Sequence, residues 1–236
     1  MDINILKSSE RGTSKYDWLL SRHSFSFGNY HDPKRMNFGL LRVFNDDIVD
    51  AGKGFGMHQH DNMEIISIVL EGSLGHRDSM GNHGIIKEGE VQRISAGTGI
   101  SHSEFNHSKT GKSHFLQIWV EPDEINLEPS YEQKSFSKLE KNKLNIIASG
   151  DKNKNSLYLH QDAVFLIGVF DESKIIDYRL KNPESGVYAF AIYGDAEIGK
   201  NSLQKGDSAE ITSAEKIEIK TKGKSSVLII EVPIAP

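Results

Sequence analysis

The chain has 236 residues, of which 37% are apolar and 26% charged, and its formal net charge is −5 at pH 7. These values are ordinary for a globular protein, and the acidic balance argues against a nucleic-acid-binding surface. The chain contains no cysteine, which excludes disulfides, thiolate catalysis, iron–sulfur clusters and cysteine-bound zinc. Any metal site must therefore use nitrogen and oxygen ligands.

The N-terminal stretch MDINILKSSERG carries an acidic second residue, and its apolar part is too short for a signal peptide. A membrane-spanning helix needs about 18 consecutive apolar residues, and no such run occurs. We therefore expect a soluble cytoplasmic protein with no membrane contact. The lysines at 134–154 alternate with acidic residues, which is typical of a solvated connector rather than a phosphate-binding patch.

The rest of the chain reads mainly as short strands. Residues 14–25, SKYDWLLSRHSF, are the best candidate for one helical turn. The expected strands are β-branched or aromatic runs separated by Gly, Asn, Asp and Pro. They lie at 38–47, 63–72, 84–94, 113–122, 155–160, 163–170, 186–198 and 225–233. Many short strands with regular turn signals predict a sandwich or barrel.

A weak internal repeat indicates two similar barrels. Residues 70–94 and 192–211 each place a Gly turn after an apolar strand, then a hairpin, then a Gly-acid pair before another strand. The aligned positions are Gly72 with Gly194, and Gly89-Glu90 with Gly206-Asp207. Gly-acid pairs are also common turn chemistry, which is the competing explanation. We expect barrels at 1–133 and 134–236, and a monomer, because two barrels in one chain can pack on each other.

Two histidine-containing motifs carry the candidate chemistry. GFGMHQHDNMEII places His58 and His60 two residues apart, and GTGISHSEFNHS does the same for His102 and Glu104. Alternate strand residues share a face and lie roughly 6–7 Å apart. A lone His-x-His is weak evidence, and by itself it favours a polar strand end over a metal site. Two such pairs can deliver three imidazoles and a carboxylate to one divalent first-row metal ion, with coordination positions left open.

These motifs resemble a known family. Gly52-x5-His58-x-His60-x3-Glu64 looks like the first cupin motif, and the stretch from Gly89 to Asn106 resembles the second. The ordered blocks RVFNDD, HQHDNMEI, LEGSLGHRDSMGN, AGTGISHSEFN and LQIWVEP are similar to pirins and pirin-like bacterial quercetinases. The resemblance is dense from about residue 16 to 134.

The resemblance implies an all-β bicupin, two jelly-roll barrels with few short helices. The N-terminal barrel would hold one divalent ion (Fe, Mn, Co, Ni, Cu or Zn) through His58, His60, His102 and Glu104. General cupins take the glutamate from the first motif, here Glu64, whereas the pirin pattern takes it from the second. An extended strand would place Glu64 roughly 13 Å from His60, and a bend between strands would shorten that distance. Following the pirin pattern, we expect Glu104 to be the ligand and Glu64 to lie behind the site or to have a structural role. The C-terminal half has one histidine, His160, and is expected to be a degenerate barrel.

The implied function is that of a quercetin 2,3-dioxygenase, which cleaves the heterocyclic ring of flavonols with O₂ and releases CO. Glu104 would also act as the base that takes the flavonol hydroxyl proton. A second hypothesis is a non-catalytic, metal-containing regulatory protein that acts through a protein partner. A third is a cupin that isomerises or hydrolyses small polar metabolites, which a pocket rimmed by Arg and Lys would favour.

The remaining histidines and two phenylalanines are expected outside the ligand set. His76 and Asp78 are expected at a hairpin rim, in turn chemistry rather than at the site. Phe25 and Phe27 alternate along a strand and can line an aromatic pocket or the core. The remaining histidines have no partner at ligand spacing and are assigned to the surface or to the surroundings of the site; they are His23, His31, His83, His107 and His114.

Overall fold

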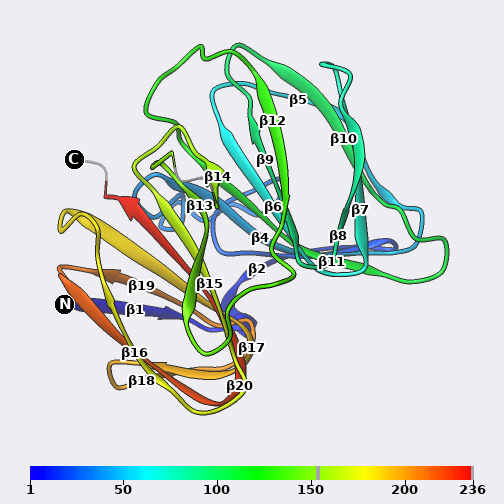
Figure 1. Cartoon of the computed structure of the whole chain (residues 1–236). Helices are drawn as coiled ribbons and strands as arrows, with labels where there is room; N and C mark the ends of the chain where they lie inside the picture. Colours follow the sequence, from blue (N-terminus) through cyan, green and yellow to red (C-terminus); the bar gives the residue numbers. More distant parts are fainter. Residues whose placement is uncertain (153–154, 235–236) are drawn as a thin grey trace.

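The computed structural model describes residues 1–152 and 155–234, which form two β-barrels lying side by side (Figure 1). In these residues every regular element is a strand except for one short 3₁₀ turn, η1, Ser8–Glu10. No helix in the described ranges is long and apolar enough to cross a membrane.

The N-terminal barrel consists of a seven-stranded and a four-stranded sheet. The larger sheet has the order β12-β9-β6-β11-β4-β3-β2, and the smaller has the order β5-β10-β7-β8. The strands of the larger sheet are β2 Gly12–Tyr16, β3 Leu19–His23, β4 Leu41–Val49, β6 Glu64–Glu71, β9 Glu90–Ser95, β11 Ser113–Val120 and β12 Ser130–Ser135. Those of the smaller sheet are β5 Gly54–His60, β7 Ser73–Asp78, β8 His83–Lys87 and β10 Ile100–Asn106.

The C-terminal barrel is a single nine-stranded sheet with the main order β1-β19-β17-β20-β15-β13-β14. Strand β16 pairs with β20, and β18 pairs with β17. Its strands are β1 Asp2–Leu6, β13 Leu144–Ser149, β14 Leu157–Tyr158, β15 Val164–Phe170, β16 Ile175–Arg179, β17 Ser185–Ile198, β18 Asn201–Leu203, β19 Ser208–Thr212 and β20 Lys216–Pro233. The register between β17 and β20 shifts on both sides of Tyr193, because bulges let two long strands bend and close the sheet.

The internal repeat is visible in the backbone. Gly72 and Gly194, which the repeat aligns, have φ angles of 77° and 68°. Gly89 and Gly206, the second aligned pair, have φ angles of 74° and 84° and stand just before β9 and β19. Side chains disfavour this left-handed region, so glycine is required at each turn. The expected fold of two jelly-roll cupin barrels is confirmed.

Two strands lie at the margins of the expected division at 133/134. The first strand of the chain, β1, pairs antiparallel with β19 and so belongs to the C-terminal sheet, beside which Figure 1 shows it. Strand β12, Ser130–Ser135, pairs with β9 in the N-terminal barrel. The division into 1–133 and 134–236 stays a prediction.

The helical turn expected at 14–25 is wrong. Strands β2 and β3 form an antiparallel hairpin there, and β3 also pairs with β4. Leu19, Ser21 and His23 are buried while the residues between them are only partly so. This alternation is the two-residue period of a strand, and pairing with β4 outweighs any local helical preference.

Side-chain parity divides the larger N-terminal sheet into two faces. Phe44, Ile66 and Leu116 point toward the C-terminal barrel and join a shared core with Phe165 and Leu228. The opposite face lines the interior of the N-terminal barrel. That interior is apolar around Phe115 and Val69 at one end and around Ile65 and Ile94 at the other. Polar side chains occupy the middle.

Candidate metal centre

Three histidines converge inside the N-terminal barrel because of how β5 pairs with β10. His58 lies directly opposite His102, and His60 lies opposite Ile100, two residues further along the same face. The three imidazole rings are 4.5–4.9 Å apart between centroids. One ring nitrogen of each lies within 4.8 Å of the others. The structure thus brings these three predicted ligands together.

Glu104 lies on the same strand but slightly apart from that group. The register between β10 and β5 shifts between His102 and Glu104, so Glu104 lies opposite Phe55. Its carboxylate comes within 4.8 Å of ring nitrogens of His102 and His76. It still lines the same cavity as His58 and His60. Three of the four expected ligands, His58, His60 and Glu104, therefore line one space, and His102 belongs to both the histidine group and the group that contains Glu104.

Three polar side chains of the larger sheet hold the Glu104 carboxylate. The amide nitrogens of Gln92 and Gln117 donate hydrogen bonds to it, each at 2.5 Å. The Ser67 hydroxyl lies 3.1 Å from the same carboxylate. All four residues are buried. Hydrogen bonds from buried donors stabilise a carboxylate charge, and they fix where its oxygens point.

The histidine group suits a metal ion. Nε2 of His60 and both ring nitrogens of His102 are buried and have no hydrogen-bond partner among the described residues. Nδ1 of His58 lies 2.7 Å from the Gly56 carbonyl oxygen, which leaves its Nε2 as the lone-pair nitrogen. Buried polar atoms normally have partners. Three available imidazole nitrogens beside a carboxylate match the ligand preference of divalent first-row metals.

Burial sets the protonation of two of these histidines. Desolvation, aided by the neighbouring imidazoles, lowers the pKa of His60 to about 4 and that of His102 to about 3. In an unfolded chain both would titrate near 6.5. The unfolded chain therefore binds more protons as the pH falls below about 6.5, and the folded, metal-free protein loses stability in that direction.

We expect each of these histidines to cost the metal-free protein up to about 1.4 kcal/mol of unfolding free energy per pH unit below about pH 6.5. Urea unfolding near neutral pH and near pH 5 measures this change. The variant His102→Gln removes one of the two groups and should show a shallower pH dependence. His83→Gln alters an exposed imidazole and should match the wild type. An unchanged slope in His102→Gln would contradict the assignment.

Glu64, the alternative ligand, lies elsewhere. Its carboxylate accepts a hydrogen bond from the backbone nitrogen of His160, at 3.3 Å. It belongs to neither group of potential metal ligands found among the described residues. Burial raises its pKa, against the opposing effects of Ser95 and Arg93. Glu64 therefore contributes to the contact with the C-terminal half.

A cavity of about 540 Å³ opens onto His58 and His60. Trp18, Phe27, Phe55 and Trp119 supply aromatic surface in it, and no Arg or Lys of the described residues lines it. Trp119 contacts both His60 and Phe27 edge-on, with centroid separations of 4.7 and 5.4 Å. Phe25, the other aromatic residue considered for the pocket, packs instead in the core between the barrels.

Polar side chains also line this cavity. His23, Asn45 and Asp47 are among them, and Nδ1 of His23 lies 2.8 Å from the Asn45 side-chain oxygen. Burial raises the pKa of Asp47 to about 7, and one of its carboxyl oxygens has no partner among the described residues. The indole nitrogen of Trp119 is likewise buried and unpartnered in the described structure. The cavity therefore offers both donors and acceptors to a flat aromatic ligand.

Sequence reasoning missed two sets of residues. Asp78 does organise a turn, accepting hydrogen bonds from the backbone nitrogens of Met80 and Asn82. His76, however, is buried beside Glu104 rather than at a rim. The period-two pair His76-x-Asp78 is the signal that could have placed it. Ser67 and Gln117 were detectable as isolated polar residues in the middle of apolar strands.

A histidine group inside the first of two jelly-roll barrels defines a two-barrel cupin with a candidate metal centre. Residues 6–120 match the family described as pirin, and residues 146–232 match the quercetinase C-terminal cupin domain. The chain belongs to the pirin family.

Relatives that cover the whole chain support this assignment. Quercetin 2,3-dioxygenase of Escherichia coli K12 is 40% identical over 98% of this chain and 99% of its own length. The crystal structure of the bacterial pirin YhhW from Escherichia coli in complex with nickel(II) superposes with a TM-score of 0.93. It shares 38% identity, over 98% of this chain and 99% of that one. A Geobacillus kaustophilus protein with 18% identity and a TM-score of 0.78 shares the fold.

Proposed function

We propose that this protein is a metal-dependent dioxygenase that cleaves the heterocyclic ring of flavonols such as quercetin, with O₂ as co-substrate and CO as a product. One observation carries the proposal: His58 and His60 of the three-histidine group line a large cavity with aromatic walls. No Arg or Lys among the described residues lines that cavity, which disfavours small anionic metabolites. The name of the Escherichia coli relative and the nickel complex of its pirin YhhW support the same assignment.

In this proposal His58, His60 and His102 hold one divalent ion, and Glu104 completes its shell. Fe, Mn, Co, Ni, Cu and Zn all suit such a donor set. When bound, the ion would supply Lewis acidity toward the 3-hydroxyl of the flavonol.

The chain's own residues would position the substrate and move its proton. The rings of Trp18, Phe55 and Trp119 provide surfaces against which a planar flavonol can pack. Asn45 and Asp47, which line the same cavity, can bind hydroxyl groups of the substrate. Glu104, inside the same cavity, accepts the proton of the 3-hydroxyl. The apolar walls exclude water while this proton is transferred.

The proposal is tested by incubating metal-loaded protein with quercetin in air and in an anaerobic chamber. We expect loss of the flavonol absorbance only when both metal and O₂ are present, and no turnover by protein stripped of metal. Each of the six candidate metals is loaded separately, and metal content is measured before the assay. Absence of turnover with all of them at full occupancy would contradict the enzyme and favour the regulatory alternative.

A further inference from the structure

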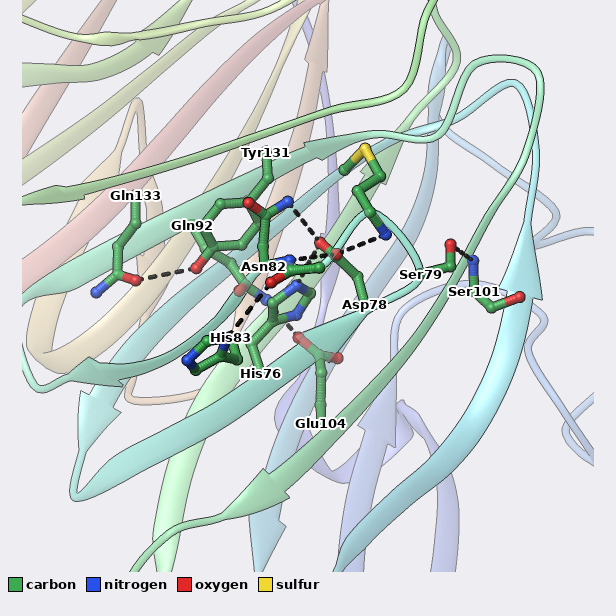
Figure 2. A network of polar contacts seen from close by, with 12 residues as sticks. His76, Asp78, Ser79, Asn82, His83, Gln92, Ser101, Glu104, Tyr131 and Gln133 are labelled. Carbon is green, nitrogen blue, oxygen red and sulfur yellow. Dashed lines mark hydrogen bonds and ion pairs between the residues drawn. The ribbon is translucent and has the colours of Figure 1, made fainter.

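His76 and Asp78 lie directly behind the candidate metal centre. Both are on β7, which pairs with the ligand strand β10 on the side away from β5. Glu104 lies opposite His76 in this ladder, and His102 lies opposite Asp78. Figure 2 shows the His76 ring between the Asp78 and Glu104 carboxylates. His76 and Asp78 have exposed fractions of 2% and 5%, so water does not compete for their contacts.

The state of the His76 ring follows from its contacts. Its Nε2 lies 3.0 Å from Oδ2 of Asp78. Nε2 therefore carries the ring proton and donates a hydrogen bond to the carboxylate. Nδ1 is then a hydrogen-bond acceptor, and it is buried without a partner in the described structure. The Tyr131 ring stacks on His76 with a centroid separation of 4.7 Å and an interplanar angle of 20°. Asp78 and Tyr131 thus fix the orientation of His76, and its Nδ1 is a hydrogen-bond acceptor without a donor among the described residues.

His102, in turn, has no acceptor for the proton of its ring in the part of the chain that the structure describes. Neither of its ring nitrogens has a hydrogen-bond partner among the described residues. If one nitrogen binds a metal ion, the other keeps its proton and requires an acceptor, as metal-bound histidines almost always have. A ring nitrogen of His76 lies within 4.8 Å of one of His102. A small ring rotation or one bridging water closes that distance.

We propose that His76, held by Asp78 and Tyr131, is the positioning residue for the metal ligand His102. Nδ1 of His76 accepts a hydrogen bond from the N–H of His102 that does not face the ion, either directly or through one water. This inference rests on the metal site of the proposed function. In that arrangement Asp78 fixes the tautomer of His76, and His76 fixes the tautomer and the ring orientation of His102. The order of contacts runs from Asp78 through His76 and His102 to the ion.

The competing assignment makes His76 a ligand of a second ion together with His102 and Glu104. One observation disfavours it: Nε2 of His76 is already committed to Asp78, so His76 could offer only Nδ1 to an ion.

Two substitutions at one position separate these roles. In His76→Gln the side-chain amide can still donate to Asp78, but nothing replaces the Nδ1 acceptor. In His76→Asn the side-chain oxygen stands near the place of Nδ1, but the contact with Asp78 is lost. We expect His76→Gln to weaken metal binding about 10- to 100-fold, the usual effect of losing an outer-shell partner, and His76→Asn to recover most of it. Competition of the intact protein with a chromophoric chelator for nickel(II) measures the affinity.

Asp78→Asn provides a second variant should His76→Gln fail to fold. Its oxygen can keep the backbone contacts with Met80 and Asn82, while its amide forces the His76 proton onto Nδ1. This should weaken nickel binding to the same extent as His76→Gln. His83→Gln, on the same hairpin and exposed, is the matched control and should bind as the wild type does.

The outcomes are distinct. One ion per wild-type chain, with weakened binding in His76→Gln and recovery in His76→Asn, supports the inference. Wild-type affinity in His76→Gln and Asp78→Asn overturns the inference and leaves the proposed function standing. Two ions in the wild type and one in both His76 variants overturns it in favour of a second ion. A wild-type chain that binds no ion contradicts the inference and the proposed function together.

Discussion

Replacing His102 by alanine is expected to abolish metal retention and flavonol turnover together. His102 lies opposite His58 and centrally in the ligand group, within 4.8 Å of candidate donors on both β5 and β7. Its loss removes one of the three imidazoles of the proposed shell and leaves His58 and His60 with Glu104, whose carboxylate lies outside the tight histidine group. We expect metal affinity to fall by more than about 100-fold, beyond the effect of losing an outer-shell partner.

The fold should survive this change, because the His102 ring makes no hydrogen bond with any described residue that the substitution could break. Metal content per chain after dialysis, measured by mass spectrometry, and far-UV circular dichroism separate site loss from unfolding. His107→Ala is the matched control, since His107 is exposed and its side chain lies on the other face of the same segment. A folded His102→Ala protein with wild-type metal content would refute the ligand assignment.

Replacing Glu104 by glutamine should cost both stability and activity. The Glu104 carboxylate accepts hydrogen bonds from the side-chain NH₂ groups of Gln92 and Gln117. These NH₂ groups can donate hydrogen bonds but cannot accept them. A glutamine at this position presents its own NH₂ group to one of them. The resulting unsatisfied buried donor costs about 1–3 kcal/mol of unfolding free energy. The substitution also removes the anionic ligand and the proposed proton acceptor, so turnover should fall to background.

Two further variants make this result specific. Glu64→Gln changes the other candidate glutamate and should retain the metal, since Glu64 contacts the His160 backbone instead. The double variant Glu104→Gln/Gln117→Glu restores a carboxylate–amide pair between the same two positions. It should regain stability without regaining turnover, because the charge now sits on β11. Metal loss in Glu64→Gln, with retention in Glu104→Gln, would reverse the assignment of the two glutamates.

The parts of the structure that a local pattern determines were predictable. His58 and His60 share one face of β5, and His102 and Glu104 share one face of β10, because a strand has a period of two. The meeting of the three histidines needs only that β5 and β10 pair, whereas the register shift after His102 sets Glu104 apart from them. The turns of the repeat were readable because the backbone at Gly72 and Gly194 requires glycine.

The parts that depend on long-range pairing were not predictable. Strand β1 pairs with β19, which lies about two hundred positions further along the chain. The sequence of Asp2–Leu6 does not indicate which strand it pairs with. The first half of β20 was not among the expected strands, although its apolar residues alternate there with Lys and Glu in the two-residue period of a half-buried strand. His76 was assigned to a turn because the turn signal of Asp78 is local, whereas its burial beside Glu104 depends on the β7–β10 ladder.

The central claim is that this metal centre performs oxygenative ring cleavage. It is tested most directly by turning over quercetin under ¹⁸O₂ with the metal-loaded wild type, and analysing both products by mass spectrometry. The predicted result is one CO for each flavonol consumed, with both labelled oxygen atoms in the depside and none in the CO. Consumption of quercetin without CO, or a depside free of label, by protein with full metal occupancy would contradict it.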